Sequence, residues 1–136
     1  MRPPHRILLV PAAAIALACS EATEPSEVRL ASFVDAFASE TSISVPDTVE
    51  AGAPFQIVVP TMTGQCQRAG RTDVVVAGQV AQVTLYEDTD CSDQDIGLLR
   101  ARGITITFAE RGNAAVRVTA RDHRGPQTIE RVIVVR

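Results

Sequence analysis

The chain has 136 residues, of which 46% are hydrophobic and 21% are charged, and these fractions are typical of a globular protein rather than a disordered one. This length suits one ordinary domain and argues against two. The formal net charge of −3 provides no attraction toward phosphate backbones, so DNA or RNA binding is not expected.

The first eighteen residues have the pattern of an export signal. Arg2, His5 and Arg6 give a positive start, and residues 7–17 form a largely apolar run. That run is too short for a permanent transmembrane helix, which needs about twenty residues. We therefore predict a signal peptide over residues 1–18 that is removed on export.

The end of this segment, Leu17-Ala18-Cys19, resembles the lipobox of bacterial lipoproteins. In that family the cysteine thiol receives a diacylglycerol, the peptide is cut before the cysteine, and the new amine is acylated. The resemblance therefore implies a lipid anchor on Cys19 and attachment to a membrane. Ser20 in place of Asp implies sorting to the outer membrane of the cell envelope. The alternative is an ordinary secreted protein in which Cys19 lies near the cleavage site by chance.

Residues 19–42 are rich in Glu, Ser, Thr and Ala and include Pro25, which is the composition of a tether. A spacing of three and four between apolar residues predicts a short helix over residues 27–39, with an apolar face formed by Leu30, Phe33, Val34 and Phe37. This face could pack on the domain or on the membrane. We favour the domain, because the opposite face is acidic rather than cationic.

From residue 43 to residue 136, apolar and polar residues alternate and turn residues such as Ala69-Gly70 interrupt them, which predicts an antiparallel all-β domain. We expect strands over residues 41–45, 54–59, 73–76, 80–87, 103–109, 114–121 and 128–135. The alternation predicts that the following side chains point into the core: Ile104, Ile106, Phe108, Val116, Val118 and Ala120. The last strand is apolar on both faces, which predicts either a bulge or burial on both sides, with Ile129, Ile133 and Val135 on one face and Val132 and Val134 on the other.

The stretch from Val45-Pro46 through Phe55 to Cys66, and the strand that opens at Gly112, resemble bacterial immunoglobulin-like domains of small envelope lipoproteins. The resemblance spans most of residues 43–136. It implies an immunoglobulin-like antiparallel β-sandwich of about seven strands that acts as a monomeric, non-enzymatic structural or protein-interaction module. A sandwich of different topology remains open, because the chain has no Trp to match the core Trp of antibody-type domains.

Cys66 and Cys91 remain once Cys19 carries lipid. An even pair in an oxidising compartment predicts one disulfide. Closing a loop of about 26 residues would stabilise the fold by roughly 3 to 4 kcal/mol on the chain-entropy model. The alternative is a metal or redox thiol pair, which we disfavour because the spacing is wide and no histidine lies nearby.

Residues 87–95 carry five carboxylates, Glu87, Asp88, Asp90, Asp93 and Asp95. Oxygen-rich loops can bind Ca²⁺, and the four aspartates are the candidate ligands of a calcium- or small-ligand-binding domain. We prefer a solvated acidic hairpin loop, because the glycine and the late glutamate of an EF-hand loop are missing at the required spacing. No other cofactor is expected.

His123 is the only histidine after the predicted signal peptide, and it lies between the last two predicted strands. A lone turn histidine is more often exposed than catalytic. Gly-x-Ser-x-Gly, His-Glu-x-x-His and phosphate-binding glycine motifs are absent from the sequence. We therefore predict no enzymatic activity, and a pair of carboxylates across a groove is the alternative that remains.

Overall fold

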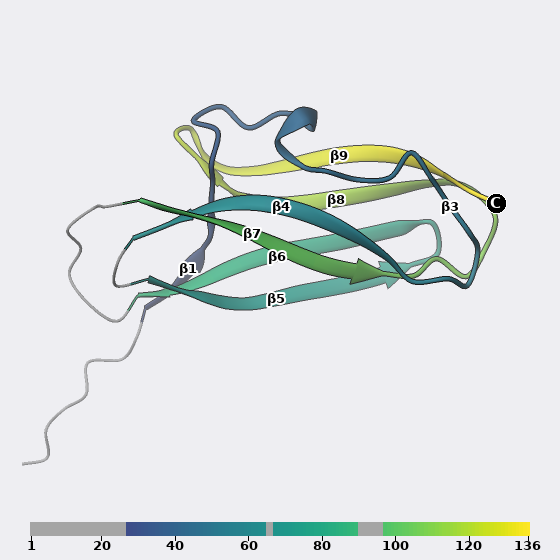
Figure 1. Cartoon of the computed structure of the whole chain (residues 1–136), viewed down its shortest axis with the longest axis horizontal. Helices are drawn as coiled ribbons and strands as arrows, with labels where there is room; N and C mark the ends of the chain where they lie inside the picture. Colours follow the sequence, from purple (N-terminus) through teal and green to yellow (C-terminus); the bar gives the residue numbers. More distant parts are fainter. Residues whose placement is uncertain (1–26, 65–66, 90–96) are drawn as a thin grey trace, which may run out of the picture.

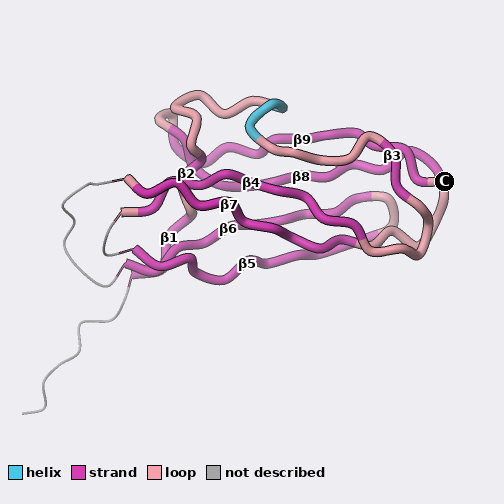
Figure 2. Tube along the Cα trace, viewed as in Figure 1, coloured by secondary structure: helices cyan, strands magenta, loops and turns pink. Residues whose placement is uncertain are grey.

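The computed structural model describes residues 27–64, 67–89 and 97–136. Most of these residues lie in strands, and the one helical element among them is a single 3₁₀ turn, η1 (Glu40–Ser42). The predicted all-β fold class is confirmed (Figure 2). Within the same residues no helix is long and apolar enough to cross a membrane.

Nine strands form the described part of the domain, against about seven predicted. They are β1 (Glu27–Leu30), β2 (Ser32–Phe33), β3 (Thr48–Val49), β4 (Phe55–Thr63), β5 (Gln67–Ala77), β6 (Val80–Thr89), β7 (Leu98–Ile106), β8 (Gly112–Asp122) and β9 (Gly125–Val135). The six strands predicted between residues 54 and 135 correspond to β4 through β9. The strand predicted over residues 41–45 is wrong, because η1 occupies its start and only a single bridge from Ser44 to Val58 follows.

The strands are arranged in two layers around one core (Figure 1). One layer has the order β5, β6, β8, β9, β3, and the other consists of β4 and β7. The short strand β2 pairs with both β4 and β8, so the two layers belong to one curled sheet.

The sheet is mixed, whereas a wholly antiparallel one was predicted. β6 and β8 pair in parallel, as do β3 with β9 and β2 with β8. The parallel β6–β8 pair arises because β7 leaves this layer to pair with β4, so that the chain returns beside β6 in the original direction.

The helix predicted over residues 27–39 is wrong, and residues 27–42 are not part of a tether. β1 pairs antiparallel with β6, and β2 with β4. Between them Ala31, which is fully buried, donates its N–H to the carbonyl of Leu85 at 2.9 Å and accepts from the N–H of Arg121 at 2.8 Å. The N-terminal segment thus fills the space where β6 and β8 separate, and it satisfies backbone groups that a helix would leave unpaired.

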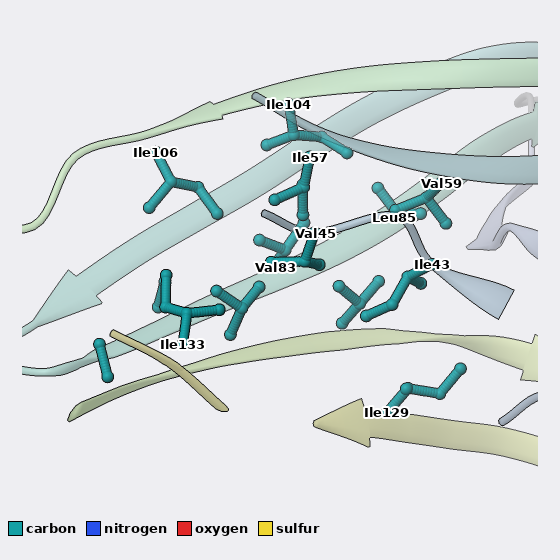
Figure 3. Packing of buried hydrophobic residues seen from close by; sticks show 14 of the residues in the cluster. Ile43, Val45, Ile57, Val59, Val83, Leu85, Ile104, Ile106, Ile129 and Ile133 are labelled. Atoms are coloured by element: carbon teal, nitrogen blue, oxygen red, sulfur yellow. The ribbon is translucent and has the colours of Figure 1, made fainter. Parts of the chain in front are cut away.

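The core is built from Val, Ile, Ala and Leu side chains of both layers, together with Phe33 and Phe108. Figure 3 shows the packing of part of this cluster, with Ile57 facing Val83 and Val45. All six side chains predicted to point inward in β7, β8 and the segment between them are buried. In β9 the pairing with β8 is unbroken, and Val132 and Val134 are exposed. The prediction of a bulge or of burial on both faces is therefore wrong, because no element of the described part covers the outer face of β9.

Candidate functional site

The core changes from apolar to polar toward one end of the two layers. Inward-facing positions along β6 are Ala81, Val83 and Leu85, and the next in the series is Glu87. In β7 the series Ile106, Ile104 continues to Arg102, and in β4 it ends at Thr61 and Thr63. We call the four buried polar residues that continue these three series the polar end of the core: Thr61, Thr63, Glu87 and Arg102.

Glu87 is a fully buried carboxylate held by one ion pair. Its partner in the β1–β6 register is Arg29, whose Nε donates to Oε1 of Glu87 at 2.8 Å. The interpretation of residues 87–95 as a solvated loop is therefore wrong for Glu87, because β6 continues to Thr89 and turns this side chain inward. β1 supplies the positive charge that offsets the burial of the carboxylate.

Arg102 extends from β7 across to β6. Its Nη1 donates to the carbonyl oxygen of Tyr86 at 2.7 Å. Burial lowers the pKa of Arg102, while the nearby charge of Glu87 acts in the opposite direction. The other two nitrogens of this guanidinium, Nε and Nη2, are buried without a hydrogen-bond partner among the described residues, and so is Oε2 of Glu87. Buried polar groups are seldom left in this state, so these three atoms require an explanation.

A β-bulge in β5 lies directly beside Glu87. The register between β5 and β6 shifts between Ala69 and Thr72, so Gly70 and Arg71 together face the backbone at Tyr86. A Cβ atom on Gly70 would lie 2.9 Å from the carbonyl oxygen of Tyr86, so only glycine fits. The bulge sets the Arg71 guanidinium 4.5 Å above the centroid of the Tyr86 ring.

We expect Gly70→Ala to lower the free energy of unfolding by about 1 to 3 kcal/mol, because the added methyl group must displace the β6 backbone. The measurement is urea unfolding. Gly103→Ala is the matched control, since a Cβ in that β7 position meets nothing closer than 3.9 Å. Equal losses in the two variants would show that the bulge imposes no special packing constraint.

β5 is an edge strand, because among the described residues it pairs only with β6. Its second half presents three consecutive exposed valines, Val74, Val75 and Val76, with Val75 at 59% exposure. We call residues 72–77 the β5 edge. β7 is the edge strand of the other layer, since it pairs only with β4 in the described part.

The segment 34–42 crosses the turn between β8 and β9 and is held there by Asp122. The carboxylate of Asp122 accepts from the backbone N–H of Ala38 at 2.9 Å and from Nε of Arg124 at 3.0 Å. The Arg124 guanidinium, followed by the backbone N–H groups of Arg124 and Ala38, lowers the pKa of Asp122 to about 2. His123 is exposed, as predicted, and its backbone N–H donates to the carbonyl of Ala36 at 3.0 Å.

The low pKa of Asp122 makes this attachment sensitive to acid. The folded value of about 2 lies below the ordinary 3.8, so the unfolded chain binds the proton more readily. The contribution to stability is complete above pH ~4 and is lost as the pH falls toward 2. In the wild type, the urea concentration at the midpoint of unfolding should fall between pH ~4 and pH ~2. We expect this fall to be smaller in Asp122→Asn, because the variant has no carboxylate to protonate at this position. Asp47→Asn is the control, because that carboxylate is 90% exposed, and it should leave the decline unchanged.

No protein-family model, curated protein or solved structure matches the chain. Its function is therefore inferred from the geometry of its own residues. The described ranges hold no group of three or more His, Cys, Asp or Glu side chains that could bind a metal ion.

Most of the site residues predicted from the sequence lie outside the described residues: Cys19, Cys66, Cys91, Asp90, Asp93 and Asp95. The calcium site and the disulfide therefore stay predictions. The fourth candidate calcium ligand, Asp88, lies in β6 beside Glu87 and pairs in register with Val28 of β1 and Arg68 of β5.

Sequence reasoning missed three members of the polar end of the core, Thr61, Thr63 and Arg102. It also missed the roles of Arg29 and Gly70 beside them. A signal for Arg102 exists, because extending the alternation of Ile106 and Ile104 backward by two residues reaches it. Arg29 and Gly70 carry no such local signal. Their roles depend on which strands pair with β6.

Proposed function

We propose that this chain is an exported bacterial lipoprotein of the outer membrane, anchored through Cys19, whose all-β domain binds another protein without catalysing a reaction. The export pattern of residues 1–18 and the lipobox-like ending support export of the chain and its attachment to the outer membrane. The observation that carries the binding role is the β5 edge, an apolar stretch of strand with no neighbour on one side among the described residues.

An exposed strand edge can add a strand from another chain, and proteins that avoid such pairing protect their edges with charges, prolines or bulges. β5 has such protection only in its first half, where the bulge at Gly70 is followed by the ion pair of Arg71 with Asp73 at 3.4 Å. The β5 edge has no charge after Asp73. The partner that fits it is an extended segment with apolar side chains at alternate positions and no charge facing the valines.

The test is capture of a partner from the cell envelope by the full chain and by two variants. Val75→Lys places a charge on the β5 edge, whereas Val132→Lys places one on the outer face of β9 at a residue of similar exposure, 62%. We expect one protein to be captured by the wild type and by Val132→Lys and to be lost with Val75→Lys. In the complex, amide hydrogen exchange at residues 74–76 should slow. A partner retained by Val75→Lys, or no slowing at these amides, would rule out edge pairing.

Cleavage and lipid attachment at Cys19 are tested separately, by intact-mass measurement of the native protein extracted from membranes. We expect a mature chain that begins at Cys19, carries three acyl chains, and lacks two hydrogens because Cys66 and Cys91 form a disulfide. A chain that starts elsewhere with an unmodified thiol and washes into buffer would overturn the lipoprotein assignment and leave the binding test intact.

A further inference from the structure

The buried guanidinium of Arg102 presents one complete edge that no described residue uses. Nε and Nη2 lie on the same edge of the planar group, and both are buried without a hydrogen-bond partner in residues 27–64, 67–89 and 97–136. Two parallel N–H groups in this arrangement match the two oxygens of a carboxylate, which is the strongest common way for arginine to bind an anion. The remaining nitrogen, Nη1, is fixed on the Tyr86 carbonyl and therefore sets the direction of the open edge.

The charges at the polar end of the core leave room for one negative charge. Among the described residues of this cluster, Arg29 and Arg102 are positive and Glu87 is negative, so its net charge is +1. Arg100, on the same strand as Arg102, is exposed and is therefore screened by water. Burying a charge without a full set of partners is costly, so a monoanion bound beside Arg102 would offset part of that cost. A dianion or a neutral molecule would leave the cluster unbalanced.

Glu87 adds a requirement for a hydrogen-bond donor. Its Oε1 accepts from Arg29, while Oε2 is buried without a donor. Thr61 and Thr63 do not fill this role, because their hydroxyls donate to the carbonyls of Arg100 and Leu98, respectively. A hydroxyl next to a carboxylate supplies the two groups that these positions lack, a donor for Glu87 and an anion for Arg102. An ammonium in place of the hydroxyl would cancel the negative charge that the cluster favours.

We propose that the polar end of the core binds a small 2-hydroxycarboxylate, with Nε and Nη2 of Arg102 donating to its carboxylate and Oε2 of Glu87 accepting from its hydroxyl. Both protein groups are already oriented, since each is tied on its other side to a neighbouring strand. This site is independent of partner binding at the β5 edge.

The experiment is a titration of the full chain, observed through the ¹H–¹⁵N resonance of the Arg102 Nε–H group, with four probes: glycolate, acetate, acetamide and inorganic phosphate. We expect a saturable shift with glycolate, binding at least ~3-fold weaker with acetate because the hydroxyl is missing, and none with acetamide. Glycolate also raises the unfolding temperature, because it binds only the folded chain.

Variants are tested by calorimetric titration with glycolate. Arg102→Lys keeps the charge but loses the paired N–H groups, so its affinity should fall at least ~10-fold, whereas Arg100→Gln on the same strand should change it less than ~3-fold. Glu87→Gln should remove the preference for glycolate over acetate. Circular dichroism verifies that each variant is folded.

Three outcomes would overturn the proposal. The first is the absence of a saturable shift, which would show that water alone hydrates the buried groups. The second is equal binding of phosphate and glycolate, which would show a general anion site. The third is unchanged glycolate affinity in a folded Arg102→Lys variant, which would place the ligand elsewhere.

Discussion

Glu87→Ala is expected to lower the free energy of unfolding by about 3 to 5 kcal/mol, since it breaks the ion pair with Arg29 and removes the negative charge that acts on the buried Arg102. Arg102 is 8% exposed and Glu87 is fully buried, so water cannot replace the lost carboxylate. Arg29 also loses its partner, but it is partly exposed and can hydrate. The loss therefore arises mainly from Arg102.

Urea unfolding at neutral pH measures this effect, and two further variants isolate its cause. Glu130→Ala removes a surface carboxylate that pairs with Arg117 at 2.6 Å, and its cost should be about 0 to 1 kcal/mol because both groups are solvated. The double variant Glu87→Leu, Arg102→Met should recover most of the lost stability, because it removes both buried charges. A double variant as unstable as Glu87→Ala would show that packing, rather than charge, is responsible.

Phe108→Ala should lower the free energy of unfolding by a similar amount, about 3 to 5 kcal/mol, by opening a cavity in the core. The side chain is fully buried and its ring stacks on that of Phe55, with centroids 5.9 Å apart. Its carbonyl oxygen also accepts from the N–H of Gly52 at 2.8 Å, so the residue fixes the turn before β4 against the segment after β7.

The same urea measurement on Phe37→Ala provides the control, because Phe37 is 64% exposed. Its ring contacts the His123 ring and the Arg124 guanidinium. Its cost should stay below ~1 kcal/mol. The expectation is contradicted if the losses in free energy of unfolding of the two variants differ by less than ~1 kcal/mol. Such a result would show that the core collapses into the space left by the Phe108 ring.

The strands from β4 to β9 could be predicted because a period of two is a local property of the sequence. In β8, Val116, Val118 and Ala120 alternate with polar residues, and the structure buries all three. β1 and β2 could not be predicted in this way, since they are short and owe their conformation to distant partners in β6, β4 and β8. The helical spacing of Leu30 and Phe33 has no counterpart in the structure, because tertiary pairing outweighs local pattern.

The polar end of the core was accessible from the sequence only in part. The acidic composition of residues 87–95 singled out Glu87 as part of a possible site. The burial of Glu87, however, depends on β6 continuing beyond residue 87. Gly70 suggested a turn, whereas it lies within β5, at a bulge that only the approach of the Tyr86 backbone explains. Such contacts depend on strand register, which composition and spacing do not specify.

The start of β1 at Glu27 limits how far the domain can stand from the bilayer. If Cys19 is the lipidated residue, eight Cα steps join it to the first strand and extend at most ~30 Å. The C-terminus and β3 lie at the end of the molecule opposite β1 (Figure 1) and would point away from the lipid. With that anchor, the strand β1 would stay within this distance of the bilayer surface, and the domain would meet neighbours close to the same leaflet.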